Sequence, residues 1–162
     1  MKKILLTLMA IFAFGLQNIN AQDAPLKIVT NHPDFNIKVK RCAASGKTVV
    51  LDLILTNEGA NDVETVEVKG GSGYSEAYDN EGNIYQGNKI KVKVANRNEY
   101  SEYGTGDFSI PTGVPMKVSI NIEGVPQAAE SIARLKLVVH CNVWGLNNLK
   151  PVRFSNIPIA RN

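Results

Sequence analysis

The sequence predicts a nearly all-β domain built as a two-sheet antiparallel sandwich. Its apolar residues alternate with polar ones in short runs, which is the pattern of strands with one buried face. About eight such runs recur at intervals of roughly 10 to 15 residues, separated by Gly, Asn and Pro. Beyond the N-terminal segment, no long stretch shows the 3.6-residue period of a helix. A small closed barrel is the alternative arrangement.

The N-terminal half contains three strand signals: Phe35 to Val39, Val49 to Leu55, and Val63 to Val68, which stops at Gly70-Gly71. The second of these is apolar or β-branched at almost every position, so we expect a central strand covered on much of both faces. Asn57-Glu58-Gly59 follows it as a turn signal.

Six further strand signals follow along the chain: Tyr74 to Tyr78, Ile84-Tyr85, Ile90 to Val94, Met116 to Ile122, Leu135 to Cys141, and Val152 to Ile159. The turn-forming residues 79–83 suit a hairpin loop between the first two. Gln127 to Ala133 has room for at most one helical turn. The final strand contains Pro158, so we expect it to lie at a sheet edge or to end there.

The first 21 residues predict a signal peptide. Two lysines follow the initiator methionine, and residues 4–16 are then apolar except for Thr7 and Gly15. That run of about 13 residues is too short to span a bilayer. Cleavage after Ala21 fits best, and Ala13-Phe14-Gly15 offers a weaker alternative. No cysteine lies near either site to accept a lipid, so we expect a periplasmic or secreted protein without a transmembrane anchor.

We therefore divide the chain into a signal peptide (1–21), an N-terminal extension (22–34) and one sandwich domain (35–162). Its 162 residues exclude a two-domain enzyme. The formal net charge of the whole chain is +3. Without the two lysines of the signal peptide, sixteen basic residues stand against fifteen acidic ones, so the basic character largely disappears.

Two cysteines, Cys42 and Cys141, lie in the expected mature protein. Cys141 continues the inward series of its strand, whereas Cys42 follows a break in alternation, so both face the interior if a bulge or turn falls near Arg41. An oxidising compartment would then permit a disulfide between them. The alternative is two buried free thiols that act as small hydrophobes.

The order of three motifs resembles a known family. These are the strand Val49 to Leu55 ending in Thr56-Asn57, the hairpin Asp79-Asn80-Glu81-Gly82-Asn83-Ile84-Tyr85, and Ile110-Pro111-Thr112-Gly113 before Val118 to Ile122. Over roughly residues 35–140 they resemble small exported bacterial immunoglobulin-like domains of unknown function, whose sandwich is shared with a secreted immunoprotective antigen of mycobacteria. The resemblance implies an immunoglobulin-like fold and export but supplies no catalytic or binding residue. The chain departs from the pattern in its C-terminal strand and in lacking a lipid-accepting cysteine.

The sequence offers no catalytic constellation. Of the two histidines, His140 is out of phase with the inward residues of its strand, and His32 and Asp34 alternate in an extended segment and therefore point opposite ways. Gly70-Gly71-Ser72-Gly73-Tyr74 fails as a nucleophile elbow because a tyrosine replaces its last glycine. The loop that begins at Asp79 does not match a calcium-binding loop, because its glycine is at the fourth position and not the sixth and no glutamate follows at the twelfth. The two cysteines and two histidines do not have the spacing of zinc ligands. We therefore expect that the protein is not an enzyme and that it binds no metal ion or cofactor.

Five tyrosines are the candidate binding residues: Tyr74, Tyr78, Tyr85, Tyr100 and Tyr103. An amphipathic ring on a loop gives a large contact area at little entropic cost. If the hairpin and the loop of residues 96–106 meet, these side chains form a tyrosine-rich tip. The alternative is that they pack on the sheet.

We therefore expect an exported, non-catalytic module that binds a protein or glycan of the cell envelope. The alternatives are a small hydrolase or sugar-active protein whose site assembles only in three dimensions, and a structural component of a surface assembly with an open edge strand. We expect no nucleic-acid partner, because Lys89, Lys91 and Lys93 alternate with apolar residues and so indicate the solvated face of a strand.

Overall fold

The computed structural model describes residues 24–30, 32–141 and 151–161. The expected signal peptide and its cleavage site lie outside these ranges. The described strands are β1 (Lys27–Val29), β2 (Phe35–Ser45), β3 (Thr48–Asn57), β4 (Val63–Val68), β5 (Glu76–Asp79), β6 (Ile84–Tyr85), β7 (Ile90–Val94), β8 (Phe108–Ile110), β9 (Pro115–Glu123), β10 (Ser131–Leu137), β11 (Val139–Cys141), β12 (Val152–Pro158) and β13 (Ala160–Arg161). None of the described segments is a helix long and apolar enough to cross a membrane.

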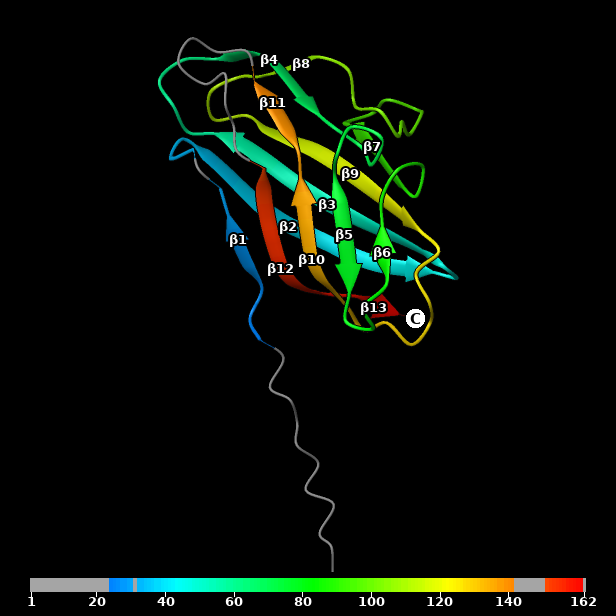
Figure 1. Ribbon diagram of the computed structural model, residues 1–162. Coiled ribbons are helices and arrows are strands. Elements are labelled where there is room, and N and C mark those ends of the chain that lie inside the picture. Colours follow the sequence, from blue (N-terminus) through cyan, green and yellow to red (C-terminus); the bar gives the residue numbers. More distant parts are fainter. Residues whose placement is uncertain (1–23, 31, 142–150, 162) are drawn as a thin grey trace, which may run out of the picture.

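The strands form a β-sandwich, which confirms the predicted fold class (Figure 1). The front sheet has the order β1-β12-β10-β5-β6, and the back sheet has the order β13-β2-β3-β9-β7. A smaller upper sheet, β11-β4-β8, extends the sandwich at one end. Every strand pair in these sheets is antiparallel except β13 with β2, which is parallel. β1 lies inside the expected N-terminal extension and forms the edge of the front sheet on β12.

The back sheet is built on the long hairpin of β2 and β3. β3 lies between β2 and β9, as its apolar pattern predicts. Gly46, at φ 58°, occupies the tight turn that joins Ser45 to Thr48. The register of the hairpin shifts between Val39 and Arg41, so of the bulge or turn expected near Arg41 the structure has the bulge.

Two strands of the front sheet, β10 and β12, end before the chain passes to another sheet. The strand predicted from Leu135 to Cys141 divides at Val138, so that β10 belongs to the front sheet and β11 to the upper sheet. β12 ends at Pro158, although it lies between β1 and β10 and not at an edge. The chain then crosses to the back sheet as β13. Residues 127 and 128 form a turn before β10 begins.

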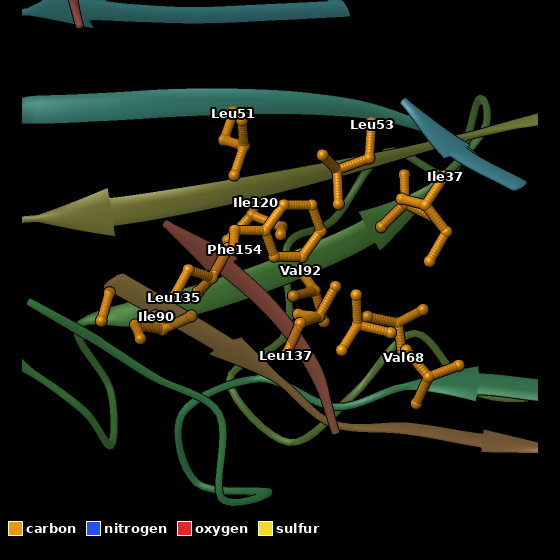
Figure 2. Packing of buried hydrophobic residues seen from close by; sticks show 14 of the residues in the cluster. Ile37, Leu51, Leu53, Val68, Ile90, Val92, Ile120, Leu135, Leu137 and Phe154 are labelled. Carbon is orange, nitrogen blue, oxygen red and sulfur yellow. The ribbon is translucent and has the colours of Figure 1, made fainter. Parts of the chain in front are cut away.

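The core fills the space between the front and back sheets (Figure 2). Leu51, Leu53 and Ile120 of the back sheet face Phe154 and Leu135 of the front sheet, and all five are fully buried. Burial of each such side chain contributes about 1.5 to 3 kcal/mol before the cost of ordering the chain. This alternation leaves the opposite face of each sheet to polar and half-buried side chains.

The two cysteines are buried free thiols, as in the alternative stated above, and no disulfide joins them. Val139 lines the same small cavity as Ile37, whereas Cys42 lies five residues farther along β2, a distance of about 16 Å at the rise of a strand. Cys141 pairs with Val66 on the upper sheet and so continues away from that cavity. Burial raises the pKa of each thiol to about 12, with a nearby Arg161 lowering that of Cys42 slightly. Both thiols are therefore protonated at neutral pH and are poor nucleophiles.

Candidate functional site

The glycine-rich loop between β4 and β5, here called the glycine loop, packs against the loop that precedes β8. The amide of Gly70 donates to the carbonyl of Tyr103 at 3.2 Å, and the amide of Ser72 donates to the carbonyl of Glu102 at 3.0 Å. A Cβ atom at Gly70 would overlap the backbone of Glu102, and one at Gly73 would lie 2.6 Å from the carbonyl oxygen of Tyr103. Glycine is therefore needed at both positions because two backbones approach each other there.

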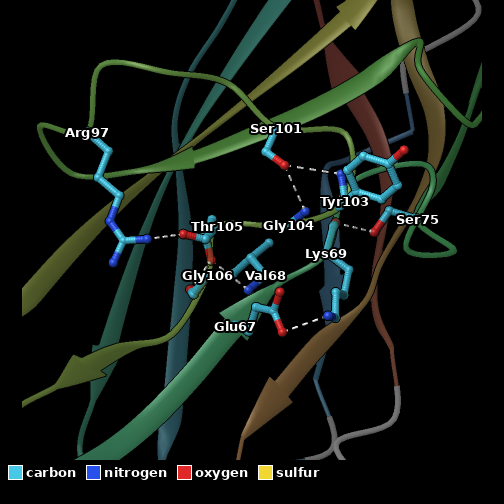
Figure 3. A network of polar contacts seen from close by, with 10 residues as sticks. All are labelled: Glu67, Val68, Lys69, Ser75, Arg97, Ser101, Tyr103, Gly104, Thr105 and Gly106. Atoms are coloured by element: carbon cyan, nitrogen blue, oxygen red, sulfur yellow. Dashed lines mark hydrogen bonds and ion pairs between the residues drawn. The ribbon is translucent and has the colours of Figure 1, made fainter.

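Ser75 anchors the end of the glycine loop where the front sheet passes into the upper sheet (Figure 3). Its hydroxyl donates to the carbonyl of Lys69 at 2.7 Å and accepts from the amide of Val138 at 3.0 Å. Lys69 also forms a 2.6 Å ion pair with Glu67 of β4. These contacts fix the backbone beside Tyr74, the exposed residue that precedes Ser75.

The side chain of Tyr74 is 81% exposed. Its φ of 74° lies in the left-handed region that non-glycine residues seldom adopt. A bulky residue held there costs of order 1 to 3 kcal/mol, and such strain is most often found at functional sites. Its amide donates to the carbonyl of Gly71 at 3.1 Å, which closes the turn that displays the ring.

Tyr78 lies on the outer face of the front sheet. It stands between Ile84 of β6 and Arg134 of β10 in the register of the strands. Ile84 is 52% exposed, Arg134 is exposed and Tyr78 is half-buried. An apolar, an aromatic and a cationic side chain thus form one row across three strands.

A shallow groove of about 340 Å³ lies between Tyr74 and this row. Its lining residues are Gly71, Ser72, Tyr74, Ser75, Glu76, Gln86, Gly87 and Lys136. The Lys136 ammonium is 3.6 Å from the carboxylate of Glu76, and both are partly exposed, so this pair contributes little to stability. The groove therefore presents one cation, one anion and one amide beside an exposed aromatic ring.

Tyr85 does not belong to an exposed surface, because it is 1% exposed. It pairs with Ala77, whose side chain also faces the core, and its hydroxyl donates to Asp79 Oδ2 at 2.6 Å. Burial, followed by the hydrogen bond to Asp79, raises the pKa of Tyr85 well above its ordinary value. Burial alone would raise the pKa of Asp79, but hydrogen bonds from Tyr85, Asn83 and Glu81 hold it below its ordinary value. Tyr85 and Asp79 are therefore structural residues of the hairpin.

The two tyrosines of the loop of residues 96–106 lie in different environments. Tyr103 is 70% exposed, and its backbone lies against Gly73, the residue before Tyr74. Tyr100 is half-buried, and the ammonium of Lys93 on the back sheet lies 4.6 Å from its ring centroid. The structure thus brings the loop of Tyr103 to the glycine loop, as the predicted tip requires, but engages Tyr100 with the back sheet.

We call the resulting region the tyrosine surface. It consists of Tyr74, Glu76, Tyr78, Ile84, Gln86, Tyr103, Arg134 and Lys136. Ile84 and the charged residues of β5 and β10 were not predicted from the sequence. The alternation of each strand indicates that these side chains point outward, and this could have been read from the sequence. The pairing of β5 with β10, which brings them together, could not.

The remaining candidate side chains do not assemble into a catalytic or metal site. His32 Nδ1 accepts from the amide of Asp34 at 3.2 Å, and its ring meets the edge of Phe35 at 5.4 Å. His140 is exposed on β11, opposite Glu67. Across residues 24–30, 32–141 and 151–161, no three His, Cys, Asp or Glu side chains gather as a metal site would require.

No protein-family model and no curated protein matches the sequence. Among solved structures, a family 123 glycoside hydrolase from Clostridium perfringens, described for glycolipid glycan hydrolysis, aligns with 85% of this chain and 27% of its own at 12% identity and a TM-score of 0.39. Spo0M, a sporulation control protein from Bacillus subtilis, aligns with 86% of this chain and 51% of its own at 11% identity and a TM-score of 0.32. The chain thus spans about half or less of each of these structures, and at such TM-scores neither likeness identifies a family.

Proposed function

We propose that this protein is an exported, non-catalytic immunoglobulin-like module that binds a protein of the cell envelope through the tyrosine surface. The observation that carries the proposal is the display of Tyr74. Its ring is 81% exposed although its backbone is held in a strained conformation by the glycine loop. Such strain has no evident benefit to the sandwich itself, and an exposed ring on a backbone held in one conformation is well suited to contact a partner.

The composition of the surface supports a protein partner. Tyrosine and arginine are enriched at the centres of protein interfaces, where they supply much of the binding energy. Tyr74, Tyr78 and Arg134 provide these side chains, and Ile84 adds exposed apolar area between them and the sheet edge. The groove beside them has room for one side chain of a partner.

The chemistry of the groove supports binding without catalysis. Glycoside hydrolysis generally needs two carboxylates about 5 to 10 Å apart. Among the residues that line the groove, Glu76 is the one carboxylate, and it is paired with Lys136. A glycan remains the alternative ligand, because an exposed aromatic ring beside polar groups also suits a sugar.

The test is a comparative capture of envelope proteins by the immobilised protein. A Tyr74→Ala, Arg134→Glu double variant should lose a partner that the wild type retains. Lys47→Glu, an exposed change in the turn between β2 and β3, should retain that partner and controls for the change of charge. Parallel binding to immobilised glycans separates the two ligand classes. Equal capture of every partner by all three proteins would disprove the proposal.

A further inference from the structure

The outer face of the back sheet, opposite the tyrosine surface, is strongly cationic. Seven cationic side chains project from it or from its margins: Lys38, Lys40, Arg41, Lys89, Lys91, Lys93 and Lys117. Two carboxylates project from the sheet itself, Asp52 and Glu123, and Glu58 lies at the β2 margin, where it accepts a hydrogen bond from Asn36. The outer face of the front sheet carries four cations, Lys27, Arg134, Lys136 and Arg153, beside one carboxylate, Glu76. The back sheet therefore has the larger excess of positive charge.

Both carboxylates on the sheet itself are paired with cations of the same face. Asp52 is 6% exposed, with Oδ1 accepting from the hydroxyl of Ser119 at 2.6 Å and Oδ2 lying 3.2 Å from the ammonium of Lys117. Glu123 is paired with Lys91 at 2.7 Å. Hydrogen bonds and the nearby cations hold the pKa of Asp52 below its ordinary value although burial opposes this.

The cations that form no ion pair with a carboxylate of the described residues lie along two margins of the cationic face. Lys38, Lys40 and Arg41 are exposed along β2, and no carboxylate in the described part of the chain is within ion-pair distance of them. Lys89 and Lys93 lie on the β7 side. Because β3 and β9 separate β2 from β7, the two margins are about 14 Å apart at the usual strand spacing.

We propose that the cationic face docks the protein on an anionic lipid surface. A single extended polyanion follows one line of cations, whereas a planar array of headgroups reaches both margins of a sheet at once. A single nucleic-acid strand would also need open aromatic rings for base stacking. The ring of Tyr100 lies near this face, and the ammonium of Lys93 covers it.

The orientation that follows leaves the tyrosine surface free. The front and back sheets are the two layers of the sandwich, so a bilayer against the back sheet leaves the outer face of the front sheet toward solvent (Figure 1). Attraction of this kind acts within a Debye length, about 8 Å at physiological salt. Each cation near an anionic bilayer strengthens binding by about fivefold.

The test is co-sedimentation with vesicles, using the chain that begins at Gln22, the expected product of export. Vesicles with about 30% anionic lipid should bind it at low salt, and zwitterionic vesicles should not. Lys38→Glu and Lys93→Glu, one on each margin, should each weaken binding, and the double variant should weaken it by at least about 25-fold. The matched control is Lys27→Glu with Arg153→Glu, which changes the charge equally on the front sheet.

Four results would overturn the proposal. These are equal binding to zwitterionic vesicles, binding that persists in about 0.5 M salt, equal loss in the matched control, and dependence on one margin alone. The last result would indicate a linear polyanion such as a nucleic acid or an acidic polysaccharide. Circular dichroism of each variant establishes that a loss of binding is not a loss of fold.

Discussion

Replacing Tyr85 with phenylalanine isolates the buried contact that fixes the β5–β6 hairpin. The ring stays in the core, but Asp79 Oδ2 loses a 2.6 Å hydrogen bond and keeps the one from the Asn83 side chain at 2.9 Å. A hydrogen bond to a charged group contributes about 1.5 to 3 kcal/mol to stability, so we expect a loss of about 2 kcal/mol. For a domain of this size, that corresponds to a fall in Tm of about 6 °C. Urea unfolding at neutral pH measures the change directly.

Tyr78→Phe is the matched control, because Tyr78 is half-buried and its hydroxyl bonds to no group in the described part of the chain. We expect it to change stability by less than about 0.5 kcal/mol. The pH dependence adds a second test. Since the folded pKa of Asp79 is lowered, its contribution is present above its ordinary value of 3.8 and is lost as the pH falls through the folded pKa. The wild type and Tyr85→Phe should therefore converge in acid. Equal losses for Tyr85→Phe and Tyr78→Phe, or a difference independent of pH, would refute this reasoning.

Three further predictions concern buried positions. Gly70→Ala should cost about 2 kcal/mol or more, since its Cβ would overlap the facing loop backbone, and a denaturation midpoint equal to wild type would contradict this. Ser119→Ala should cost about 1.5 kcal/mol at neutral pH because buried Asp52 loses a donor. That deficit should shrink as the pH falls through the lowered pKa of Asp52, which titration of stability against pH would show. Cys42 and Cys141, with pKa values near 12, should resist a thiol reagent in the native protein and react fully in denaturant; an intact mass with two hydrogens missing would contradict the free-thiol assignment.

Much of the back sheet could be predicted because two local sequence patterns determine the position of its central strand and its bulge. The apolar residues on both faces of Val49 to Leu55 left a central position as the natural one for that strand. The break in alternation after Val39 indicated the bulge near Arg41, since a strand that keeps its inward face must absorb one extra residue there.

The tyrosine surface could be predicted only in part, because its assembly depends on long-range pairing. The sequence predicted one strand from Tyr74 to Tyr78, but Tyr74 lies in a turn at positive φ before β5 begins. Tyr85 is in a two-residue strand, which is too short for alternation to reveal its inward direction. The different environments of Tyr100 and Tyr103 follow from the path of a long loop, and no local pattern encodes that path.

The proposed disulfide shows the same limit. The inward phase of Cys42 and Cys141 was correctly inferred, and both side chains are buried. Phase along a strand says nothing about which end of the sandwich a residue occupies. That position depends on strand order and on the division of the strand at Val138.

Site-specific photo-crosslinking in cells tests the proposed binding role of the tyrosine surface most directly. A photoreactive amino acid would replace Ile84, which is 52% exposed in that surface, and, in a separate protein, Lys47 in the turn between β2 and β3. The proposal predicts a discrete crosslinked protein at position 84 that is absent at position 47 and disappears when Tyr74→Ala is added. No crosslink at position 84, or the same crosslinked protein from both positions, would contradict it.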